Sequence, residues 1–359
     1  MKSESCGCRL LSGKSGPRLW RISPLKALGL SISVAAFLGS APRTASVASA
    51  AVAIGDGSSN ASAGAPQVPN VLKSYGANVP TWRVAGVHYH VGVPDGLMLK
   101  DPSTISMAGV SVDAVHHIVK VTGSNVTLNG YDFSGGGGWQ VNVQAANTTI
   151  KNCNFVVGSN NLVPIYGTSG ASDLFVVYCT INGAGRDPSP SGGLITYSGD
   201  SFTVDHCWLH DSGGDMIQQE GGGSGSTITI AHNLIQNGGL SPGSHGDYTQ
   251  LLTSGPATVE INYNMTTQAG AMSQGLMTDA YQRGEITHNV MIGSCTFFTS
   301  MDIKTLSGTM TVRDNYYDAS KAYGFVYPNS GPDDSSPLSV FIHNVDMTNG
   351  AVVEDSRRQ

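Results

Sequence analysis

The 359-residue sequence has few cysteines, few charged residues and little helical periodicity. Six cysteines are too few for a disulfide scaffold in a chain of this length. After residue 50, no apolar run is long enough to span a bilayer as a helix. These absences count against a disulfide-stapled fold and a membrane-spanning bundle, and they favour a chain built from short strands.

The first fifty residues are typical of an export signal rather than of a folded domain. A basic segment is followed by an apolar run over residues 27–41 and by the small-residue site Ala48-Ser49-Ala50. We expect residues 1–50 to direct export to the periplasm or the medium, with an uncleaved amphipathic anchor as the alternative. Residues 51–70 are rich in Gly, Ala and Ser and predict a flexible leader.

Without residues 1–50 the chain is strongly acidic. The totals of 19 basic and 25 acidic residues fall to 12 and 24, a formal charge of −12. Nucleic acid and anionic membranes are poor partners for such a surface, because they require a basic face. A polyanionic substrate would need a cation or a local group of basic residues.

A repeat governs the chain from Asn125 onward. Strands of alternating apolar residues end at one equivalent position, and successive positions are 22 to 31 residues apart. Self-similarity of this period with abundant Gly predicts an all-β parallel β-helix over residues 125–350. We expect residues 71–124 to cap its open end and residues 351–359 to form a tail. The equivalent positions are Tyr131, Cys153, Cys179, Cys207, Asn233, Asn264, Asn289, Asn315 and Asn344.

The residue types at this position suit a column inside the coil. A stacked Asn can pass amide hydrogen bonds along the axis and tolerates left-handed backbone geometry. Cys153, Cys179 and Cys207 should form a buried stack of thiols in the same row. Neighbouring cysteines would lie close enough for a disulfide, but their parallel side-chain directions favour free thiols.

The run Phe202–Leu209, followed by Gly214–Ile217, resembles the strand, turn, strand unit of pectate lyases in the pectin-lyase-like superfamily. The resemblance covers roughly residues 125–350 and implies a right-handed parallel β-helix with an N-terminal cap. It also implies inward aliphatic stacks, here Ile230, Ile261, Ile286 and Val312. Lyases, hydrolases, epimerases and adhesive proteins share this coil, so the resemblance alone does not fix the activity. The sequence lacks the Asp-Pro-His-Asp motif of alginate epimerases and the Gly-His-Gly and Arg-Ile-Lys motifs of polygalacturonases.

Two aspartates at equivalent strand starts are candidates for catalysis. In register, Asp215 and Asp247 lie about 5 Å apart, with Gln218 and Gln250 three residues further on as candidate substrate-binding residues. The carboxylates could bind Ca²⁺, share a proton as an acid/base pair, or be kept apart by water and Gly-rich loops. At such a separation they could also serve a retaining glycoside hydrolase, although loops can shift the distance.

Other candidate catalytic residues lie in loops and on later coils. His245 is in the excursion 238–246, which makes its coil longer than its neighbours. Uronate elimination needs a base for the C5 proton and a cation beside the carboxylate, and Arg283 and Lys304 are available cations. A solvated surface role is the alternative for each of these three residues. The histidines that precede the repeat position are interpreted as structural: His206, His232, His288 and His343.

Four aromatic residues fall between successive repeat positions and could stack against sugar rings: Trp139, Tyr166, Tyr197 and Tyr248. Packing of half-buried rings is the alternative. Together these features predict an exported carbohydrate-active β-helix protein acting on an extracellular polysaccharide, with a lyase reaction first and Ca²⁺ as the candidate cofactor. The alternatives are a non-catalytic polysaccharide-binding or adhesion protein and a glycoside hydrolase that uses Asp215 and Asp247.

Overall fold

The computed structural model describes residues 67–186, 192–222, 225–244, 246–278, 282–301, 310–318, 324–328 and 340–353. The expected export signal and most of the expected leader lie outside these residues. Within them, no helix has the length and apolar character needed to cross a membrane. Nearly all regular structure in the described residues is β-strand, as predicted for an all-β coil.

One sheet of the described residues contains nine parallel strands, and each strand immediately precedes one repeat position. In chain order they are β3 (Thr127–Asn129), β5 (Ala146–Lys151), β8 (Ser172–Val177), β11 (Asp200–Asp205), β14 (Ser226–Ala231), β17 (Ala257–Asn262), β19 (Gln282–Thr287), β21 (Met310–Arg313) and β24 (Val340–Ile342).

The second sheet of the described residues contains seventeen strands. They are β1 (Val110–Asp113), β2 (Ile118–Val121), β4 (Gln140–Val143), β6 (Asn154–Val156), β7 (Ile165–Gly167), β9 (Thr180–Asn182), β10 (Gly193–Tyr197), β12 (Trp208–His210), β13 (Asp215–Glu220), β15 (Leu234–Gln236), β16 (Asp247–Leu252), β18 (Met265–Thr278), β20 (Val290–Met301), β22 (Tyr316–Tyr317), β23 (Gly324–Pro328), β25 (Asn344–Asp346) and β26 (Ala351–Val353).

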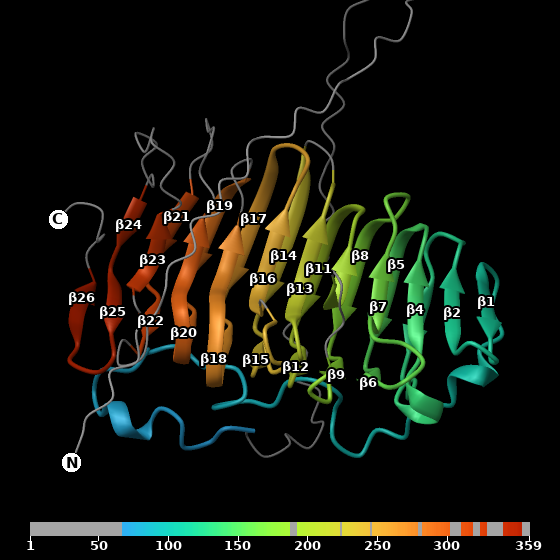
Figure 1. Cartoon of the computed structure of the whole chain (residues 1–359), viewed down its shortest axis with the longest axis horizontal. Coiled ribbons are helices and arrows are strands. Elements are labelled where there is room, and N and C mark those ends of the chain that lie inside the picture. The colour runs from blue at the N-terminus through green and yellow to red at the C-terminus, as the bar shows by residue number, and fades with distance from the viewer. Residues whose placement is uncertain are drawn as a thin grey trace, which may run out of the picture. The chain divides into compact units, whose positions relative to one another are not determined.

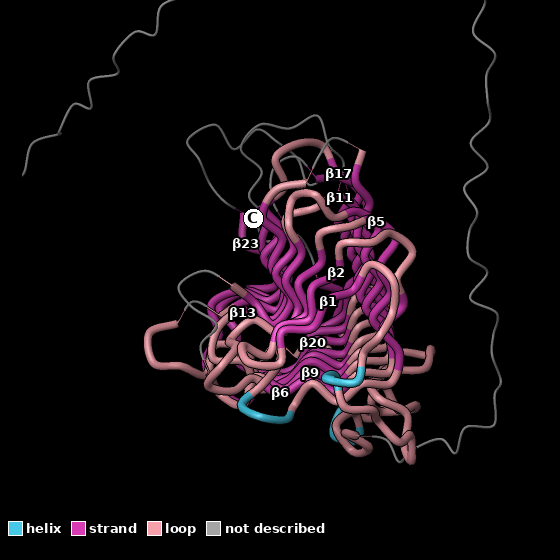
Figure 2. Tube along the Cα trace, turned by 90° about the vertical axis from the view of Figure 1, so that its right-hand side faces the viewer, coloured by secondary structure: helices cyan, strands magenta, loops and turns pink. Residues whose placement is uncertain are grey.

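The chain winds through these sheets as a parallel β-helix. A coil runs from a strand of the nine-stranded sheet into a short strand such as β15, through a loop into a longer strand such as β16, and back. Viewed from one end, the strands of successive coils lie behind one another (Figure 2). Antiparallel strands cover both ends of the seventeen-stranded sheet, β1 against β2 and β26 against β25 (Figure 1). Unpaired strand edges are thereby reduced.

Columns of apolar side chains fill the coil. Ile230, Ile261 and Ile286 pair in register across β14, β17 and β19, and Val312 continues the column. All four side chains are fully buried, which confirms the predicted inward stack. Burying each such side chain contributes about 1.5–3 kcal/mol.

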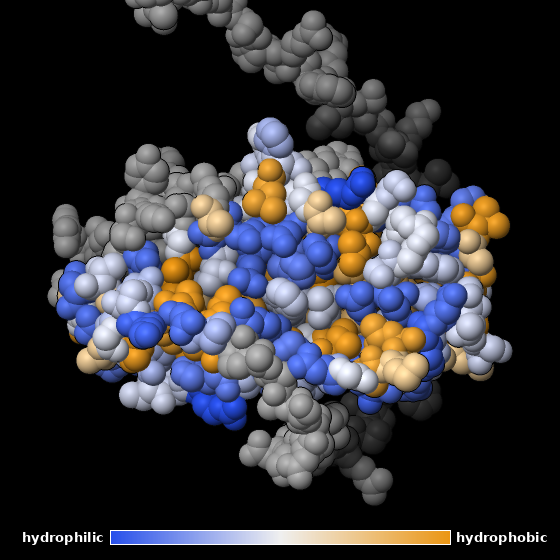
Figure 3. Space-filling view, turned by 90° about the horizontal axis from the view of Figure 1, so that it is seen from below, coloured by the Kyte–Doolittle hydropathy of each residue, from blue (hydrophilic) through white to orange (hydrophobic). Residues whose placement is uncertain are grey.

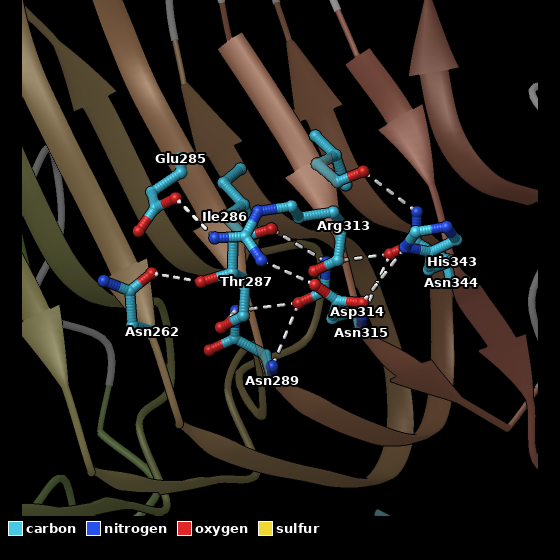
Figure 4. Close-up of polar contacts among 11 residues, drawn as sticks. Asn262, Glu285, Ile286, Thr287, Asn289, Arg313, Asp314, Asn315, His343 and Asn344 are labelled. Atoms are coloured by element: carbon cyan, nitrogen blue, oxygen red, sulfur yellow. Dashed lines mark hydrogen bonds and ion pairs between the residues drawn. The ribbon is translucent and has the colours of Figure 1, made fainter.

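A ladder of asparagine amides runs along the axis beside these columns. The Nδ2 group of Asn233 donates to Oδ1 of Asn264 over 2.9 Å, and the same bond repeats up to Asn344. Each Oδ1 also accepts from the backbone N–H of the previous rung, as in the 3.0 Å bond from Asn233 N to Asn264. Figure 4 shows the last rungs, Asn289, Asn315 and Asn344. The predicted ladder is confirmed.

Left-handed backbone geometry occurs one residue before the ladder rather than on it. His206, His232 and His288 have φ of 51°, 55° and 56°, whereas the ladder asparagines have no positive φ. Asparagine tolerates this geometry, but in the structure the residue before each ladder asparagine adopts it. The three histidines have a structural role, because each turns the chain at the corner of its coil.

The rings at these corners form a second column, outside the coil. Tyr178, His206, His232, Tyr263 and His288 stack in sequence with centroids 4.7 to 5.3 Å apart. Such stacking adds to the stability of neighbouring coils.

Residues 67–100 run along the coil as a strap before the first coil begins. Near the strap's start, Asn78 donates to the backbone carbonyl of Met347, and near its end Lys100 forms a β-bridge with Tyr131. The strap therefore passes beneath most of the coils, from β25 back to β3 (Figure 1). Hydrophobic and hydrophilic residues are interspersed on this face (Figure 3). The short helix η1 (Lys73–Tyr75) lies within the strap, η2 (Pro102–Thr104) follows its end, and η3 (Gly135–Gly137) lies in the first coil.

Replacing Asn264 by Ala should destabilise the protein by about 3 kcal/mol or more. The change leaves buried donors on Asn233 and the carbonyl of Ile230 without their partners, at a cost of roughly 1–3 kcal/mol for each unsatisfied group. Denaturant unfolding measures the difference. Thr127→Ala, on an exposed position of β3, should change the unfolding free energy by less than about 0.5 kcal/mol. Equal effects of the two changes would contradict the ladder's role.

The thiols of Cys153, Cys179 and Cys207 should resist alkylation in the native protein and react after denaturation. All three are free and fully buried. Burial raises the pKa of the Cys179 thiol well above its usual range, which suppresses the reactive thiolate. Alkylation followed by peptide mass mapping checks this. Modification of these cysteines in the native state, or a disulfide between them, would contradict the structure.

Candidate functional site

Asp215 and Asp247 are neighbours, as their spacing predicts. Strands β13 and β16 pair with Ile217 beside Thr249, which places the two aspartates at equivalent positions. The backbone N–H of Asp247 donates to Oδ1 of Asp215 over 2.9 Å. Their exposed fractions are only 7% and 0%. The pair is thus a buried feature that links two coils.

Gln218 and Gln250 extend this pair into a polar network. Gln218 donates to Oε1 of Gln250 over 3.1 Å, and Gln250 donates to Oδ2 of Asp247 over 3.4 Å. Gln218 also donates to Glu220, at the exposed end of β13. The Oε1 atom of Gln218 is buried and has no hydrogen-bond partner among the described residues. One acceptor of the network therefore lacks a protein partner among the described residues.

The loop between β15 and β16 folds over the loop of the preceding coil. Leu240 and Ser241 donate backbone N–H groups to the carbonyls of Ser212 and Gly213. The neck of the loop brings the backbones of Gly239 and Gly246 together so closely that a Cβ on Gly246 would lie 2.3 Å from the Gly239 Cα. The predicted excursion is thus a closed loop beside Asp247. His245 itself lies outside the described residues.

Arg283 does not join the aspartate pair. It lies exposed on β19 of the nine-stranded sheet, in register with Thr258. Asp247 instead pairs with Gln274 on β18, and the strand from Gln274 to Thr278 adds roughly 13 Å before the chain turns toward Arg283. The expected grouping of Arg283 with the pair is therefore wrong, because the repeat period aligns coils but not the two sheets. Lys304 lies outside the described residues.

Tyr197 and Tyr248 do not present a ring to solvent. Tyr197 is fully buried in register with Gln219, and its hydroxyl donates to the carbonyl of Asp200. Strand alternation puts Tyr197 on the same inward side as Ile195. Tyr248 is 1% exposed. The expectation that these rings stack on a sugar is corrected, and the packing alternative holds for both. Tyr166 is half-buried beside Thr196.

Trp139 lines a cleft of about 530 Å³ near the first coils, together with Lys100, Asp101 and Asp132. Its ring stacks on His117 with centroids 4.6 Å apart, and only 7% of the residue is exposed. The strand pairings β4–β7, β7–β10 and β10–β13 place Trp139 and Asp215 in register, at the edge of the sheet where these strands begin. Three strand steps separate them, or about 14 Å.

A further polar cluster was missed by the sequence interpretation. Asp205 accepts a hydrogen bond of 2.8 Å from Nδ1 of His206 through one oxygen, and one of 2.9 Å from Nδ1 of His232 through the other. Burial raises the pKa of Asp205, but these hydrogen bonds outweigh it and leave the pKa below its usual range. The sequence contains a pattern that could have indicated this cluster: Asp205-His206 at one corner and His232 at the next corner, 26 residues after His206.

Ca²⁺ at Asp215 and Asp247 would need further oxygen ligands from carbonyl groups, amides or water besides the two carboxylates. Calcium takes six to eight oxygen ligands. Among the described residues, Asp205, His206 and His232 form the one group of three or more His, Cys, Asp or Glu ligand atoms close enough to share a metal ion. One oxygen of Asp215 already accepts the Asp247 N–H. We therefore assign no step to calcium at this pair.

Replacing Asp215 by Ala should destabilise the protein by roughly 1–3 kcal/mol, because the buried N–H of Asp247 loses its acceptor. Asp215→Asn keeps an oxygen at that position and should cost less. Thermal and denaturant unfolding of the two variants measure the difference. If Ala and Asn are equally tolerated, the hydrogen bond between the coils contributes nothing to stability.

The family model described as right handed beta helix region matches residues 95–264. No curated protein and no solved structure shows significant similarity to the chain. Beyond residue 264, strands β18, β20, β22 and β25 continue the parallel stacking. The chain therefore has the fold of a right-handed parallel β-helix.

Proposed function

We propose that this protein is an exported carbohydrate-active β-helix protein, most specifically a lyase that cleaves an extracellular polysaccharide. The observation that carries the proposal is the position of the Trp139 cleft and the Asp215–Asp247 network on one edge of one sheet. An extended ligand that follows the coil axis could contact both. The resemblance to the pectin-lyase-like superfamily supports the choice of substrate class, and the basic n-region and apolar run of residues 1–50 support export.

A row of polar side chains, at strand positions that alternate with the inward apolar residues, supports a sugar ligand; Thr196 and Gln218 are its buried members, 4% and 3% exposed. Asn142, Tyr166, Thr196, Gln218 and Gln250 pair in register on successive strands of the seventeen-stranded sheet. Adjacent members lie about 4.8 Å apart, and their amide and hydroxyl groups can both donate and accept. Such a row suits the hydroxyl groups of successive sugar units. The free Oε1 of Gln218 provides an acceptor in the row.

We propose that the acid pair, which the row contacts through the 3.4 Å hydrogen bond from Gln250 to Asp247, takes part in proton transfer. Elimination requires a base that removes the C5 proton of a uronate and a group that neutralises the neighbouring carboxylate. Asp215 and Asp247 are the two carboxylates that the coil brings together. His245 is two residues before Asp247 in the sequence. Because Arg283 lies at the other end of the strand, we propose that His245 and Lys304 are the candidates for the positive charge.

A second function is favoured by the burial of the same pair. Both aspartates are nearly inaccessible and hydrogen-bonded, as expected for groups that hold two coils together. In that case the polar row would bind polysaccharide without cleaving it, as in an adhesion protein. The two functions make different predictions for products but the same prediction for binding.

Incubation with pectate, alginate and neutral exopolysaccharides, with and without calcium, should distinguish these functions. Elimination produces unsaturated ends that absorb in the near ultraviolet, which is the result we expect for a uronate polymer. New reducing ends without that absorbance would replace the lyase by a hydrolase. Binding without either product would support adhesion. Absence of both binding and products on every polymer would contradict the proposal.

Asp247→Asn should lower the rate of product formation by roughly 10²- to 10⁴-fold while leaving polysaccharide binding intact, because it removes a proton-transfer group without changing its shape. Initial rates of unsaturated product measure the effect. Glu260→Gln is the matched control, since it neutralises a half-buried carboxylate on the other sheet. Equal activity of Asp247→Asn and the unaltered protein would remove Asp247 from the catalytic machinery.

A further inference from the structure

The corner cluster of Asp205, His206 and His232 lies apart from the proposed polysaccharide site. The cluster is at the turn between the nine-stranded sheet and the short strands, whereas Asp215 lies beyond β12 and a loop. Its side chains are partly accessible, with exposed fractions of 9% for Asp205, 22% for His206 and 38% for His232. It therefore combines a nearly buried carboxylate with two reachable imidazoles.

The three side chains converge on one point from adjacent coils. His206 and His232 occupy equivalent corners of successive coils, and their rings stack with centroids 4.8 Å apart. Both turn Nδ1 toward the same carboxylate, and the ligand atoms of the three residues lie within 4.8 Å of one another. The left-handed backbone at both histidines fixes this orientation. The parallel stacking of coils thus assembles a preformed donor set.

We propose that Asp205, His206 and His232 form a binding site for a borderline divalent cation such as Zn²⁺. Imidazole nitrogen and carboxylate oxygen are ligands that Zn²⁺ prefers, whereas Ca²⁺ and Mg²⁺ prefer oxygen alone. Two nitrogens and one carboxylate are three protein ligands, and a tetrahedral site then leaves one position for water.

Binding replaces two hydrogen bonds with three coordinate bonds. In the hydrogen-bonded state each neutral imidazole carries its proton on Nδ1; to present the Nδ1 lone pair it loses that proton and takes one up from solvent at Nε2, with no net proton release, whereas an imidazolium loses its Nδ1 proton to solvent and keeps the proton on Nε2. One carboxylate oxygen of Asp205 lies 2.8 Å from Nδ1 of His206 and the other lies 2.9 Å from Nδ1 of His232, so both oxygens face the imidazoles that would share the ion. No redox change or other reactant is involved.

The strap supplies an independent indication of a polar ligand here. Tyr89 packs against His206, and its hydroxyl is buried without a hydrogen-bond partner among the described residues. The phenol hydroxyl of Tyr89 can both donate and accept a hydrogen bond. Gly92 also donates its N–H to the His206 carbonyl over 2.8 Å. A hydrated cation at the cluster would give the Tyr89 hydroxyl a water partner.

Calorimetric titration of the metal-free full chain with Zn²⁺ tests the proposal. We expect one high-affinity equivalent, a rise in the thermal unfolding midpoint, and weaker binding at acidic pH. His206→Asn and His232→Asn should each weaken this equivalent by roughly 10-fold or more. Asn tolerates the left-handed backbone of both positions, so the variants should fold. Far-ultraviolet circular dichroism without metal checks this.

His288→Asn is the matched control, because His288 stacks in the same column with the same backbone geometry but is not part of the cluster. It should keep the high-affinity equivalent. In the unaltered protein, Zn²⁺ should also slow hydrogen exchange at imidazole C2 of His206 and His232, mapped by peptide mass spectrometry. Absence of a high-affinity equivalent, its retention in both cluster variants, or unchanged exchange at both histidines would overturn the proposal.

Discussion

The hydrogen-bonded column of asparagine amides is the constraint on which the coil depends. Each asparagine rung accepts from a backbone N–H of the previous coil and donates to a carbonyl of that coil's strand in the nine-stranded sheet, so the buried corners at these rungs are paired. A shift of one coil by a single residue would break these bonds and turn the inward aliphatic column toward solvent. Register is therefore set twice, by the amides and by the apolar columns. Everything proposed for the outer surface rests on that register.

Successive coils keep the same strand register, but their loops differ in length. The nine-stranded sheet repeats with little variation, whereas the loops before β10, β13 and β16 differ in length and pack on one another. Variable loops on a rigid coil are where binding and catalysis are expected. The turns between the nine-stranded sheet and the short strands vary less, and the strap and the column of stacked rings pack against them.

The sequence was sufficient to predict the coil because its signals are local and repeated. Alternating apolar residues, the nine repeat positions and the pairing of Asp215 with Asp247 all follow from periodicity, and the structure confirms them. The burial of Tyr197 could have been predicted from strand alternation. The distance between Arg283 and the pair could not, because periodicity compares equivalent positions and carries no information about positions a strand apart. The Asp205 cluster was missed because each histidine was considered alone, while its partner lies on the next coil.

A crystal structure of the protein with a bound oligosaccharide would test the central claim most directly. The account predicts sugar density along the edge of the seventeen-stranded sheet, extending from the Trp139 cleft toward Gln218 and Asp215. Density confined to the nine-stranded sheet, or to the face crossed by residues 67–100, would contradict it.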